Sequence, residues 1–397
     1  MDLKNEIIAL ETEVIQLRRD IHMHPELSTQ EFRTAELVET YLQNLGIETR
    51  RAYNTGIIGL IRGGKPGKTI LLRGDMDALP ITEINDVPYS SQTPGVMHAC
   101  GHDAHTAMLL VAAKVLMAHR EELHGNVKLI FEPDEEVNGG AKFMVAEGAL
   151  EDPAVDASFA MHVNPLLEAG RIGLVSGGTA AQQESFKILI KGKGGHTSQP
   201  EKCRDPILCA ADVIQSVQML QTRELSPFDT TVIMFGSICG GTANNIVPDT
   251  VELQGTMRYL YDASDKSRQP RARMDRLVRQ VAELHRVEVE IEWEIPAYAV
   301  INHPGFVSFL NDKVIPATFG PGKTSPVVIF GGETFCEFVN RNNIPGALAW
   351  LGVGNPSIGA DKPIHTPDFM IDEKALKLGV ELHVRTAMEF LSANKNF

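Results

Sequence analysis

The sequence predicts a two-domain α/β protein, in which a mixed-sheet domain carries an inserted ferredoxin-like domain. Three observations support this prediction. The chain has 397 residues, more than most single domains. Short apolar segments alternate with helical patterns in its first and last parts, as in a largely parallel sheet. Between these parts the order of elements becomes β-α-β-β-α-β, the split ferredoxin-like unit.

The first part begins with two predicted helices. Apolar residues at helical spacing predict one helix over residues 5–23, which Pro25 ends. Ser28, followed by Glu31 three residues later, forms a capping-box pattern that predicts the start of a second helix. Strands and helices then alternate, with predicted strands over 56–61, 69–72, 126–131 and 157–161 and predicted helices over 105–119 and 140–148.

A second domain is predicted over residues 182–295, between the two parts of the first domain, 1–181 and 296–397. Its elements are predicted strands over 185–191, 231–238, 250–259 and 287–292 and predicted helices over 206–223 and 271–285. The α/β pattern then resumes, with a predicted strand over 327–330 and a final helix over 373–391. The chain is therefore expected to cross between the domains twice.

Composition and charge argue against several classes of partner. The formal net charge of −14 disfavours nucleic acids and anionic membrane surfaces, which both need a basic face, although simple solubility also accounts for it. We expect no membrane span and no signal peptide, since no apolar run is long enough and the first residues are charged. The five cysteines are scattered, which favours a reducing, cytoplasmic location over a disulfide framework.

The stretch from Met97 to His105 concentrates chemically active side chains. Cys100 and His102 are separated by Gly101, whose backbone freedom lets both neighbours point at one centre. Thiolate sulfur and imidazole nitrogen are preferred ligands of zinc and other late divalent metals. The stretch by itself leaves two interpretations open, a metal site or a Cys–His nucleophile pair.

Acidic and histidine residues also follow predicted strands. Sites in open α/β sheets form beyond the carboxyl ends of strands, so these residues are expected to meet. They are Asp75, Asp77, Glu135, Glu136, His162 and Glu333. Such a carboxylate cluster needs positive charge, and metal ions supply it. We therefore expect a pair of divalent ions, with ligands from Cys100, His102, Glu136, His162 and His365. For the other histidines, His22 and His98 among them, a surface or capping role is expected.

A series of motifs extends over nearly the whole chain. They are HMHPELS from His22, RGDMDALPI from Arg73, MHACGHDAHTAM from Met97, PDEEVNGGA from Pro133, GKGGHTSQP from Gly192, GTANNIVPDT from Gly241, GGETF from Gly331 and HTPDF from His365. Together they resemble the M20 metallopeptidase family, in its aminoacylase, hippurate hydrolase and auxin-conjugate amidohydrolase branch. The resemblance implies a catalytic domain with two metal ions, Mn²⁺ or Zn²⁺ with Co²⁺ or Ni²⁺ as further candidates. It also implies a lid domain that forms a homodimer.

The resemblance assigns roles to individual residues. Cys100, His102, Glu136, His162 and His365 match the metal ligands, and Glu135 matches the general base. Asp77 resembles a carboxylate that orients a ligand. His196 resembles a lid histidine that stabilises the oxyanion, often across the dimer. Asn245 and Arg258 resemble groups that hold the substrate carboxylate, although a surface charge is the alternative for Arg258.

The chain departs from the family pattern at three places. Glu132-Pro133-Asp134 stands where Gln-Pro-Ala is usual, so extra negative charge near the base could raise its pKa or favour a cationic substrate. Thr334 stands where Asp is common, and Asn244 stands before Asn245 where Tyr is frequent. None of these positions is a proposed ligand, so activity is expected and substrate choice stays open.

The function expected is hydrolysis of the amide bond of N-acyl amino acids or related amides, by metal-activated water with Glu135 as general base. The substrate is then a small N-acyl amino acid or a short peptide. A dipeptidase or carboxypeptidase using the same site is the nearest alternative. A hydrolase with Cys100 as nucleophile and a non-catalytic binding protein are the others, and an intact Glu135 disfavours the last.

Overall fold

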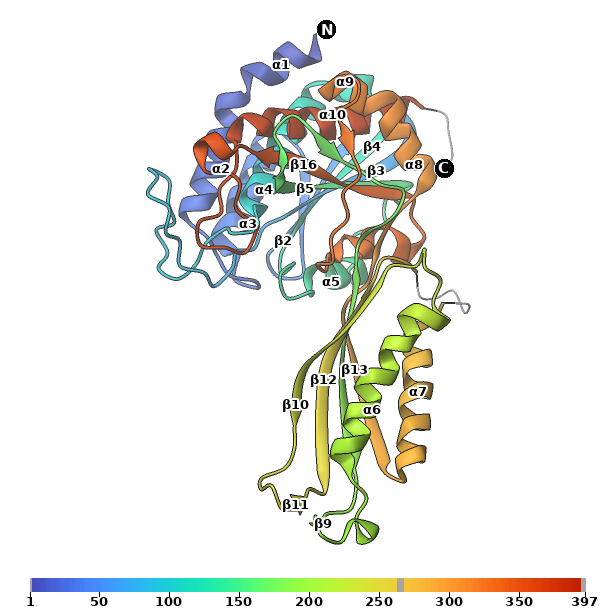
Figure 1. Cartoon of the computed structure of the whole chain (residues 1–397). Coiled ribbons are helices and arrows are strands. Elements are labelled where there is room, and N and C mark those ends of the chain that lie inside the picture. Colours follow the sequence, from blue (N-terminus) through green and yellow to red (C-terminus); the bar gives the residue numbers. More distant parts are fainter. Residues whose placement is uncertain (1, 263–267, 394–397) are drawn as a thin grey trace. The chain divides into compact units, whose positions relative to one another are not determined.

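The computed structural model describes residues 2–262 and 268–393, and the chain divides into two compact units (Figure 1). Unit 1 extends to Thr179, resumes over Val300–Val328 and continues from Thr334. Unit 2 comprises Ala180–Ala299 and Ile329–Glu333. The predicted α/β fold class with a separate antiparallel domain is confirmed. Of the described helices, none is long and apolar enough to cross a membrane.

A mixed sheet forms the centre of unit 1. Within the described residues its strand order is β1-β2-β4-β3-β5-β16-β6-β15. The strands are β1 (Glu48–Ala52), β2 (Gly56–Arg62), β3 (Lys65–Asp75), β4 (His124–Glu132), β5 (Ala157–Glu168), β6 (Ile172–Gly173), β15 (Thr324–Ser325) and β16 (Gly346–Gly354). A separate pair is formed by β7 (Gly177–Ala180) and β14 (Val300–Asn302).

The register of the parallel strands positions the site. β4, β3, β5 and β16 are parallel neighbours, so their carboxyl ends meet at one edge. Asp75 of β3 is opposite Glu132 of β4, and His162 of β5 is opposite Trp350 of β16. His162 therefore lies inside β5, whereas the sequence predicted it directly after a strand. It still reaches the same edge, because β5 continues beyond its pairing with β3, which ends at Arg73.

Helices complete unit 1. They are α1 (Leu3–Ala9), α2 (Glu11–Met23), α3 (Phe32–Asn44), α4 (His102–Ala118), α5 (Gly140–Ala146), α8 (Pro304–Phe309), α9 (Ile315–Phe319) and α10 (Leu376–Ser392). α4 is buried along nearly its whole length, and its Met108, Leu109 and Val111 belong to the main hydrophobic core. The first residue of this deeply buried helix is His102, so the core fixes a residue of the site.

Unit 2 is a four-stranded antiparallel sheet with two helices. Its elements are β8 (Gln182–Lys191), α6 (Pro206–Met219), β10 (Thr231–Cys239), β12 (Thr250–Tyr259), α7 (Pro270–His285) and β13 (Glu288–Ala297). Among the described residues the strand order is β10-β12-β8-β13, the ferredoxin-like arrangement. Asp205 caps α6 by accepting from the backbone of Ile207 and Leu208. Two short strands, β9 (Gly195–His196) and β11 (Ile246–Val247), pair separately.

Several local predictions are wrong. The helix predicted over 5–23 is two helices, α1 and α2, separated at Leu10. The capping box does not form, because Ser28 donates its hydroxyl to Asp77 and Glu31 accepts from Thr29 N. The segment 327–330 is not a strand, so Glu333 does not follow one. The chain crosses between the units four times and not twice as predicted, because Ile329–Glu333 packs with unit 2. Within unit 2, Ala181 N donates to Gly331 O.

Candidate metal centre

Unit 1 brings the predicted metal ligands together. Cys100 precedes α4 and His102 begins it, Glu136 follows β4, His162 lies in β5 and His365 lies in the loop between β16 and α10. Their ligand atoms form overlapping groups, and within each group the atoms lie within 4.8 Å of one another. Three of these groups are Cys100–His102–His162, Cys100–Glu136–His365 and His102–Glu135–Glu136, and a fourth is Asp75–His102–His105.

Cys100 belongs to two of these groups. Its Sγ lies 3.4 Å from Nε2 of His162 and 3.3 Å from Nε2 of His365. Oε1 of Glu136 lies 3.3 Å from Nε2 of His365 and 3.8 Å from Nε2 of His102. Sulfur, imidazole nitrogen and carboxylate oxygen therefore face one small volume, a donor set that suits late divalent ions.

Two buried atoms of this set fit a cation. His102 Nε2 and Glu136 Oε1 have no hydrogen-bond partner within the described part of the chain. A buried polar atom without a partner costs about 1–3 kcal/mol. A divalent ion would satisfy both atoms, because each is a good metal ligand. Since Cys100, His102 and Glu136 are shared between groups, the donor set can serve two neighbouring ions.

Asp77 orients His102. Its Oδ1 lies 3.0 Å from His102 Nδ1, while its Oδ2 accepts from Glu136 N at 2.9 Å and from Ser28 Oγ at 2.7 Å. Burial favours a higher pKa for Asp77, but the hydrogen bond to His102 and these other donors lower its pKa overall. Asp77 thus stays an acceptor, which puts the proton on His102 Nδ1 and leaves Nε2 for a metal.

His162, like His102, has its proton on Nδ1, but a backbone carbonyl holds it there in place of a carboxylate. Its Nδ1 lies 2.8 Å from the Val163 carbonyl, which can only accept, so its Nε2 carries the lone pair that faces Cys100. Burial raises the pKa of the Cys100 thiol well above its usual range, and Glu136 adds to this effect. A cation nearby would oppose both effects, so the thiolate at this place fits a metal ligand better than a free nucleophile.

The sequence places Asp75 among the residues expected to meet at the sheet edge, but it indicates no role for His105 and no partnership between the two. His105 Nδ1 lies 2.6 Å from Asp75 Oδ1, and His105 Nε2 accepts from Val163 N at 2.9 Å. Both ring nitrogens are thus engaged, so His105 orients the segment after His162 and does not act as a ligand. Asp75 also pairs with Arg73 at 2.6 Å. The spacing of His105 within the Met97–His105 stretch was the available clue, but it could not distinguish a ligand from a supporting residue.

Gly101 lets Cys100 and His102 face the same centre. Its φ of 91° lies in the left-handed region, which favours glycine. A Cβ at this position would lie 2.4 Å from Val163 Cγ2. The sequence-based expectation for Gly101 is therefore confirmed, with close approach to β5 as a second reason for glycine.

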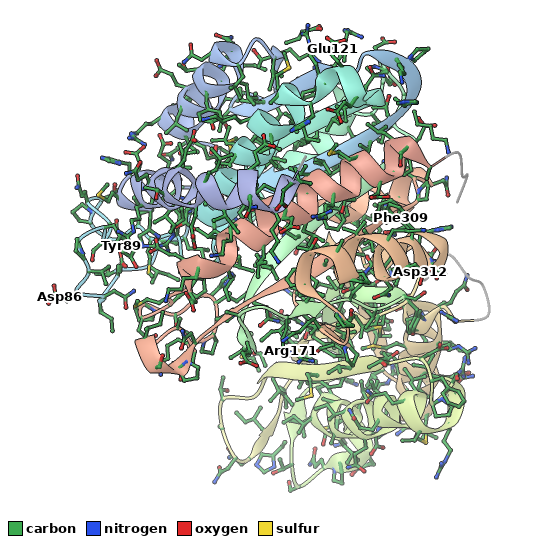
Figure 2. All side chains as sticks on the ribbon, turned by 90° about the horizontal axis from the view of Figure 1, so that it is seen from above. Asp86, Tyr89, Glu121, Arg171, Phe309 and Asp312 are labelled. Atoms are coloured by element: carbon green, nitrogen blue, oxygen red, sulfur yellow. The ribbon has the colours of Figure 1, made fainter. Side chains whose placement is uncertain are left out.

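The loop that carries His365 is tied down by backbone contacts. His365 has a φ of 63°, which is uncommon for a residue with a side chain and is typical of functional sites. Its N–H donates to Ala99 O at 2.8 Å. Further along, Ile84 N donates to Pro367 O at 3.0 Å. The segment between β3 and α4, on which Figure 2 labels Asp86 and Tyr89, therefore holds this loop on two sides.

Glu135 lies beside the predicted ligand Glu136 and faces a different segment. Its Oε1 accepts from Thr334 N at 3.1 Å. The extra carboxylates near it are both engaged by protein groups. Glu132 pairs with Arg73 at 2.6 Å, and Asp134 accepts from the Tyr53 hydroxyl at 3.0 Å. The negative charge that the sequence places around Glu135, the predicted base, is therefore partly compensated.

The chain as a whole is similar to known proteins. The family model described as "Peptidase family M20/M25/M40" matches residues 71–389. The chain belongs to the M20 peptidase family. It is an M20 family hydrolase of amide bonds, and the predicted resemblance is confirmed. Curated relatives include "Thermostable carboxypeptidase 2" of Saccharolobus solfataricus, which is 37% identical over 98% of each chain.

Two further relatives come from Bacillus subtilis. "N-acetyl-L-cysteine deacetylase" is 33% identical and covers 97% of this chain and 90% of its own. A solved structure described as a dinuclear metal binding peptidase from the M20 family has a TM-score of 0.83. It is 32% identical and covers 97% of this chain and 99% of its own. Both matches span nearly the full length of this M20 chain.

Two histidines of this M20 chain contradict the sequence-based expectation. His22 and His98 are both 1% exposed, so neither has a surface role. His22 Nδ1 lies 2.7 Å from Asp103 Oδ2, which also pairs with Arg18 at 2.7 Å. Burial favours a higher pKa for Asp103, but Arg18 and His22 lower it overall. This cluster joins α2 to the first turn of α4, where His102 lies.

The proposed lid residues of the M20 chain lie in unit 2, at two ends of its sheet. His196 is exposed on β9, and its Nδ1 accepts from Ser198 N at 3.1 Å. Asn245 is exposed beside it, and its carbonyl accepts from Thr197 N at 3.2 Å. Arg258 is near the far end of β12, where it donates to the Phe330 carbonyl. Most of the length of β12, about 25 Å at roughly 3.3 Å per residue, separates the two ends.

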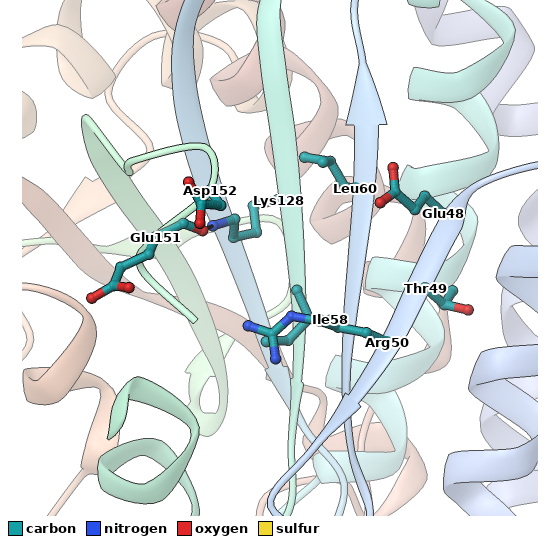
Figure 3. Close-up of a pocket in the computed structure, with 8 residues that line it drawn as sticks. All are labelled: Glu48, Thr49, Arg50, Ile58, Leu60, Lys128, Glu151 and Asp152. Atoms are coloured by element: carbon teal, nitrogen blue, oxygen red, sulfur yellow. Dashed lines mark hydrogen bonds between the residues drawn. The ribbon is translucent and has the colours of Figure 1, made fainter. Parts of the chain in front are cut away.

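A buried lysine of unit 1, Lys128, lies outside the candidate metal centre. Lys128 lines a small hollow of about 90 Å³ with residues of β1 and β2 (Figure 3). Its Nζ donates to the carbonyls of Glu151 and Pro153, at 2.6 and 2.9 Å. Burial lowers the pKa of Lys128 to about 8. Both contacts are to backbone, so this lysine fixes a loop of the M20 domain.

Replacing Gly101 with Ala tests the backbone account. A left-handed residue with a Cβ costs roughly 1–2 kcal/mol, and the contact with Val163 Cγ2 adds to that cost. Gly95→Ala is the matched control, since Gly95 has a similar φ of 79° and open space around its Cβ. Chemical denaturation should show a larger loss of unfolding free energy for Gly101→Ala than for Gly95→Ala. Equal losses would show that close packing against β5 is unimportant.

Proposed function

We propose that this chain is a dinuclear metal-dependent amidohydrolase that cleaves N-acyl amino acids into a carboxylate and an amino acid. The observation that carries the proposal is the overlap of the ligand groups at Cys100, His102 and Glu136, with Glu135 in one of them. The sequence similarity of the chain to "N-acetyl-L-cysteine deacetylase" supports the substrate class. Mn²⁺ or Zn²⁺ are the preferred ions, with Co²⁺ or Ni²⁺ as further candidates.

The protein supplies the proton transfers. Two ions held at this centre would provide the charge that brings the pKa of a water ligand towards neutral. Glu135 takes the proton of the attacking water and passes it to the leaving amine. Thr334 N, 3.1 Å from Glu135 Oε1, holds that carboxylate in place. Asp77 and the Val163 carbonyl keep the ligand tautomers of His102 and His162.

The lid contribution is proposed to come from a second copy of the chain. His196 stabilises the oxyanion, and Asn245 and Arg258 hold the substrate carboxylate. Asn245 and Arg258 lie at opposite ends of the unit 2 sheet, so one copy of unit 2 does not supply both to a single small substrate. A homodimer through unit 2 resolves this, with His196 and Asn245 coming from the partner.

Unit 2 has a surface suited to such a dimer. β10 is an edge strand of its sheet and exposes Met234 and Ile238. α6 exposes Ile207 and Leu208, which are 46% and 55% accessible. Exposed apolar side chains next to an unpaired strand edge favour association with another protein surface.

A carboxypeptidase is the second candidate function. The 37% identity to "Thermostable carboxypeptidase 2" favours it, because a peptide bond and an N-acyl bond present the same amide to the same site. The Cys100 hydrolase is disfavoured, because burial raises the pKa of this thiol and Nε2 of both His162 and His365 faces its sulfur. A non-catalytic binding protein would have no use for Glu135 at this centre.

Glu135 and Glu136 can be separated by experiment. Glu135→Gln should lower turnover of N-acetyl amino acids by about 10²–10⁴-fold, the usual cost of losing a general base. Its metal content should equal that of the parent, because no ligand is lost. Glu136→Gln should lower metal content and turnover together. Metal analysis and turnover on both variants make the test. Metal loss in Glu135→Gln, with full content in Glu136→Gln, would reverse the two roles.

Mixing inactive variants tests the dimer. Glu135→Gln and His196→Ala should each be nearly inactive alone. Mixed dimers should regain activity, because the site with an intact Glu135 receives His196 from the Glu135→Gln chain. Subunits are exchanged at low concentration, and turnover and sedimentation are measured. A mixture as inactive as its components would contradict the shared site, and a monomer at micromolar concentration would contradict the dimer.

A substrate panel separates the two candidate functions. N-acetyl amino acids, the corresponding dipeptides and N-acetyl amino acid amides are compared on metal-reconstituted protein. We expect the highest kcat/KM for N-acetyl amino acids and a loss of at least tenfold when the carboxylate is blocked, since a carboxylate paired with Arg contributes about 1.5–3 kcal/mol. Faster turnover of dipeptides would favour the carboxypeptidase.

A further inference from the structure

A buried polar cluster lies next to Glu135. Arg73 is in β3, Glu132 is the last residue of β4, and Thr334 begins the 3₁₀ helix Thr334–Phe338. Their exposed fractions are 1%, 0% and 5%. Buried groups of this kind need complete hydrogen bonding, so the contacts among them define how they can be changed.

Each contact in the cluster has a defined direction. Thr334 Oγ1 donates to Glu132 Oε1 at 2.7 Å, and Arg73 Nη2 donates to the same hydroxyl at 3.0 Å. Arg73 Nε donates to Glu132 Oε2 at 2.6 Å, and Ala141 N donates to Oε1 at 2.8 Å. Both oxygens of Glu132 therefore act as acceptors, which an ionised carboxylate can do and a neutral amide cannot.

The cluster reaches Glu135 through Thr334. Glu135 Oε1 lies 3.1 Å from Thr334 N and 3.5 Å from Thr334 Oγ1. The hydroxyl has a single hydrogen, and Glu132 at 2.7 Å receives it. Glu132 thus determines where that hydrogen points, and with Arg73 it fixes the position of the Thr334 backbone that holds Glu135.

We propose that Glu132 is a positioning residue for Glu135 and that Glu132 and Thr334 are one interdependent pair. Position 132 or position 334 can carry a carboxylate next to Arg73, in addition to Asp75. Carboxylates at both positions, or at neither, would disrupt the cluster. This accounts for the two sequence departures together, since the usual Gln and Asp at these positions also amount to one carboxylate. The inference rests on the proposed role of Glu135 as general base.

Four proteins test the inference: the parent, Glu132→Gln, Thr334→Asp and the double variant. Each single change should lower kcat on an N-acetyl amino acid by roughly 10-fold to 100-fold, within the range of coupling seen in buried networks. KM and metal content should stay within about twofold. The double variant should recover kcat to within about tenfold of the parent. Thermal melting of the metal-free proteins should show the same non-additivity.

A matched control separates positioning from general destabilisation. Glu381 is 2% exposed and pairs with Arg385 at 2.6 Å on α10. Glu381→Gln therefore makes the same chemical change at another buried glutamate paired with an arginine, here a partly exposed one, and it should lower the melting temperature without lowering kcat. If Glu381→Gln lost as much kcat as Glu132→Gln, general destabilisation would explain the loss in both variants. That result would overturn the positioning role of Glu132.

The outcomes distinguish this inference from the proposed function. An inactive parent on every amide tested would contradict the proposed function, whatever the melting temperatures show. Additive effects of the two changes, on kcat or on melting temperature, would overturn the inference. Non-additive melting with an inactive parent would support the interdependent pair and overturn its link to Glu135. Single variants with parental kcat would overturn the positioning role even if the enzyme is active.

Discussion

Buried negative charge at the carboxyl ends of β3 and β4 is the constraint on which the site depends. Asp75, Asp77 and Glu132 are at most 1% exposed, and a carboxylate in such a place needs a cation or several donors. Arg73 pairs with two of them, and Asp77 receives its donors from the protein. Asp75 Oδ2 and Glu136 Oε1 both lack a hydrogen-bond partner among the described residues, but Asp75 Oδ2 lies 2.6 Å from Arg73. Glu136 Oε1 instead faces the imidazoles of His102 and His365. The protein thus satisfies its supporting carboxylates itself and leaves Glu136 for a cation.

The same reasoning separates the histidines. For His102 and His162 an acceptor engages Nδ1 and leaves Nε2 towards the centre. For His105 both nitrogens are engaged, the second by a backbone N–H. Ligand and supporting residue are therefore distinguished by what occupies the far side of each ring. Sequence spacing cannot show this, because the deciding partners come from β3, the residues just after it and β5, far along the chain.

The fold class and the convergence of the ligand residues could be predicted because alternation of strands and helices is a local pattern with a known spatial consequence. Elements without a local pattern were missed or misplaced. β16 is buried at every position, so it shows no period of two, and no prediction was made for it. The apolar segment 327–330 predicts a strand from composition alone, but it forms none and packs in part with unit 2. The burial of His22 comes from its contact with Asp103 of α4, and the ring of His98 lies beside that of His22, and no spacing in the sequence indicates either contact.

The length of the unit 2 sheet limits what one chain does alone. The residues proposed to contact the substrate lie at opposite ends of β12, while one N-acyl amino acid is a few ångströms across. In the proposed dimer, Arg258 of one chain and Asn245 of the other meet at one site, so each site is complete only when two chains associate. Activity then depends on protein concentration, because dimerisation follows mass action. Turnover per chain decreases when the protein concentration is below the dimer dissociation constant. Under this proposal, the exposed apolar residues of β10 and α6 bear on catalysis as well as on assembly.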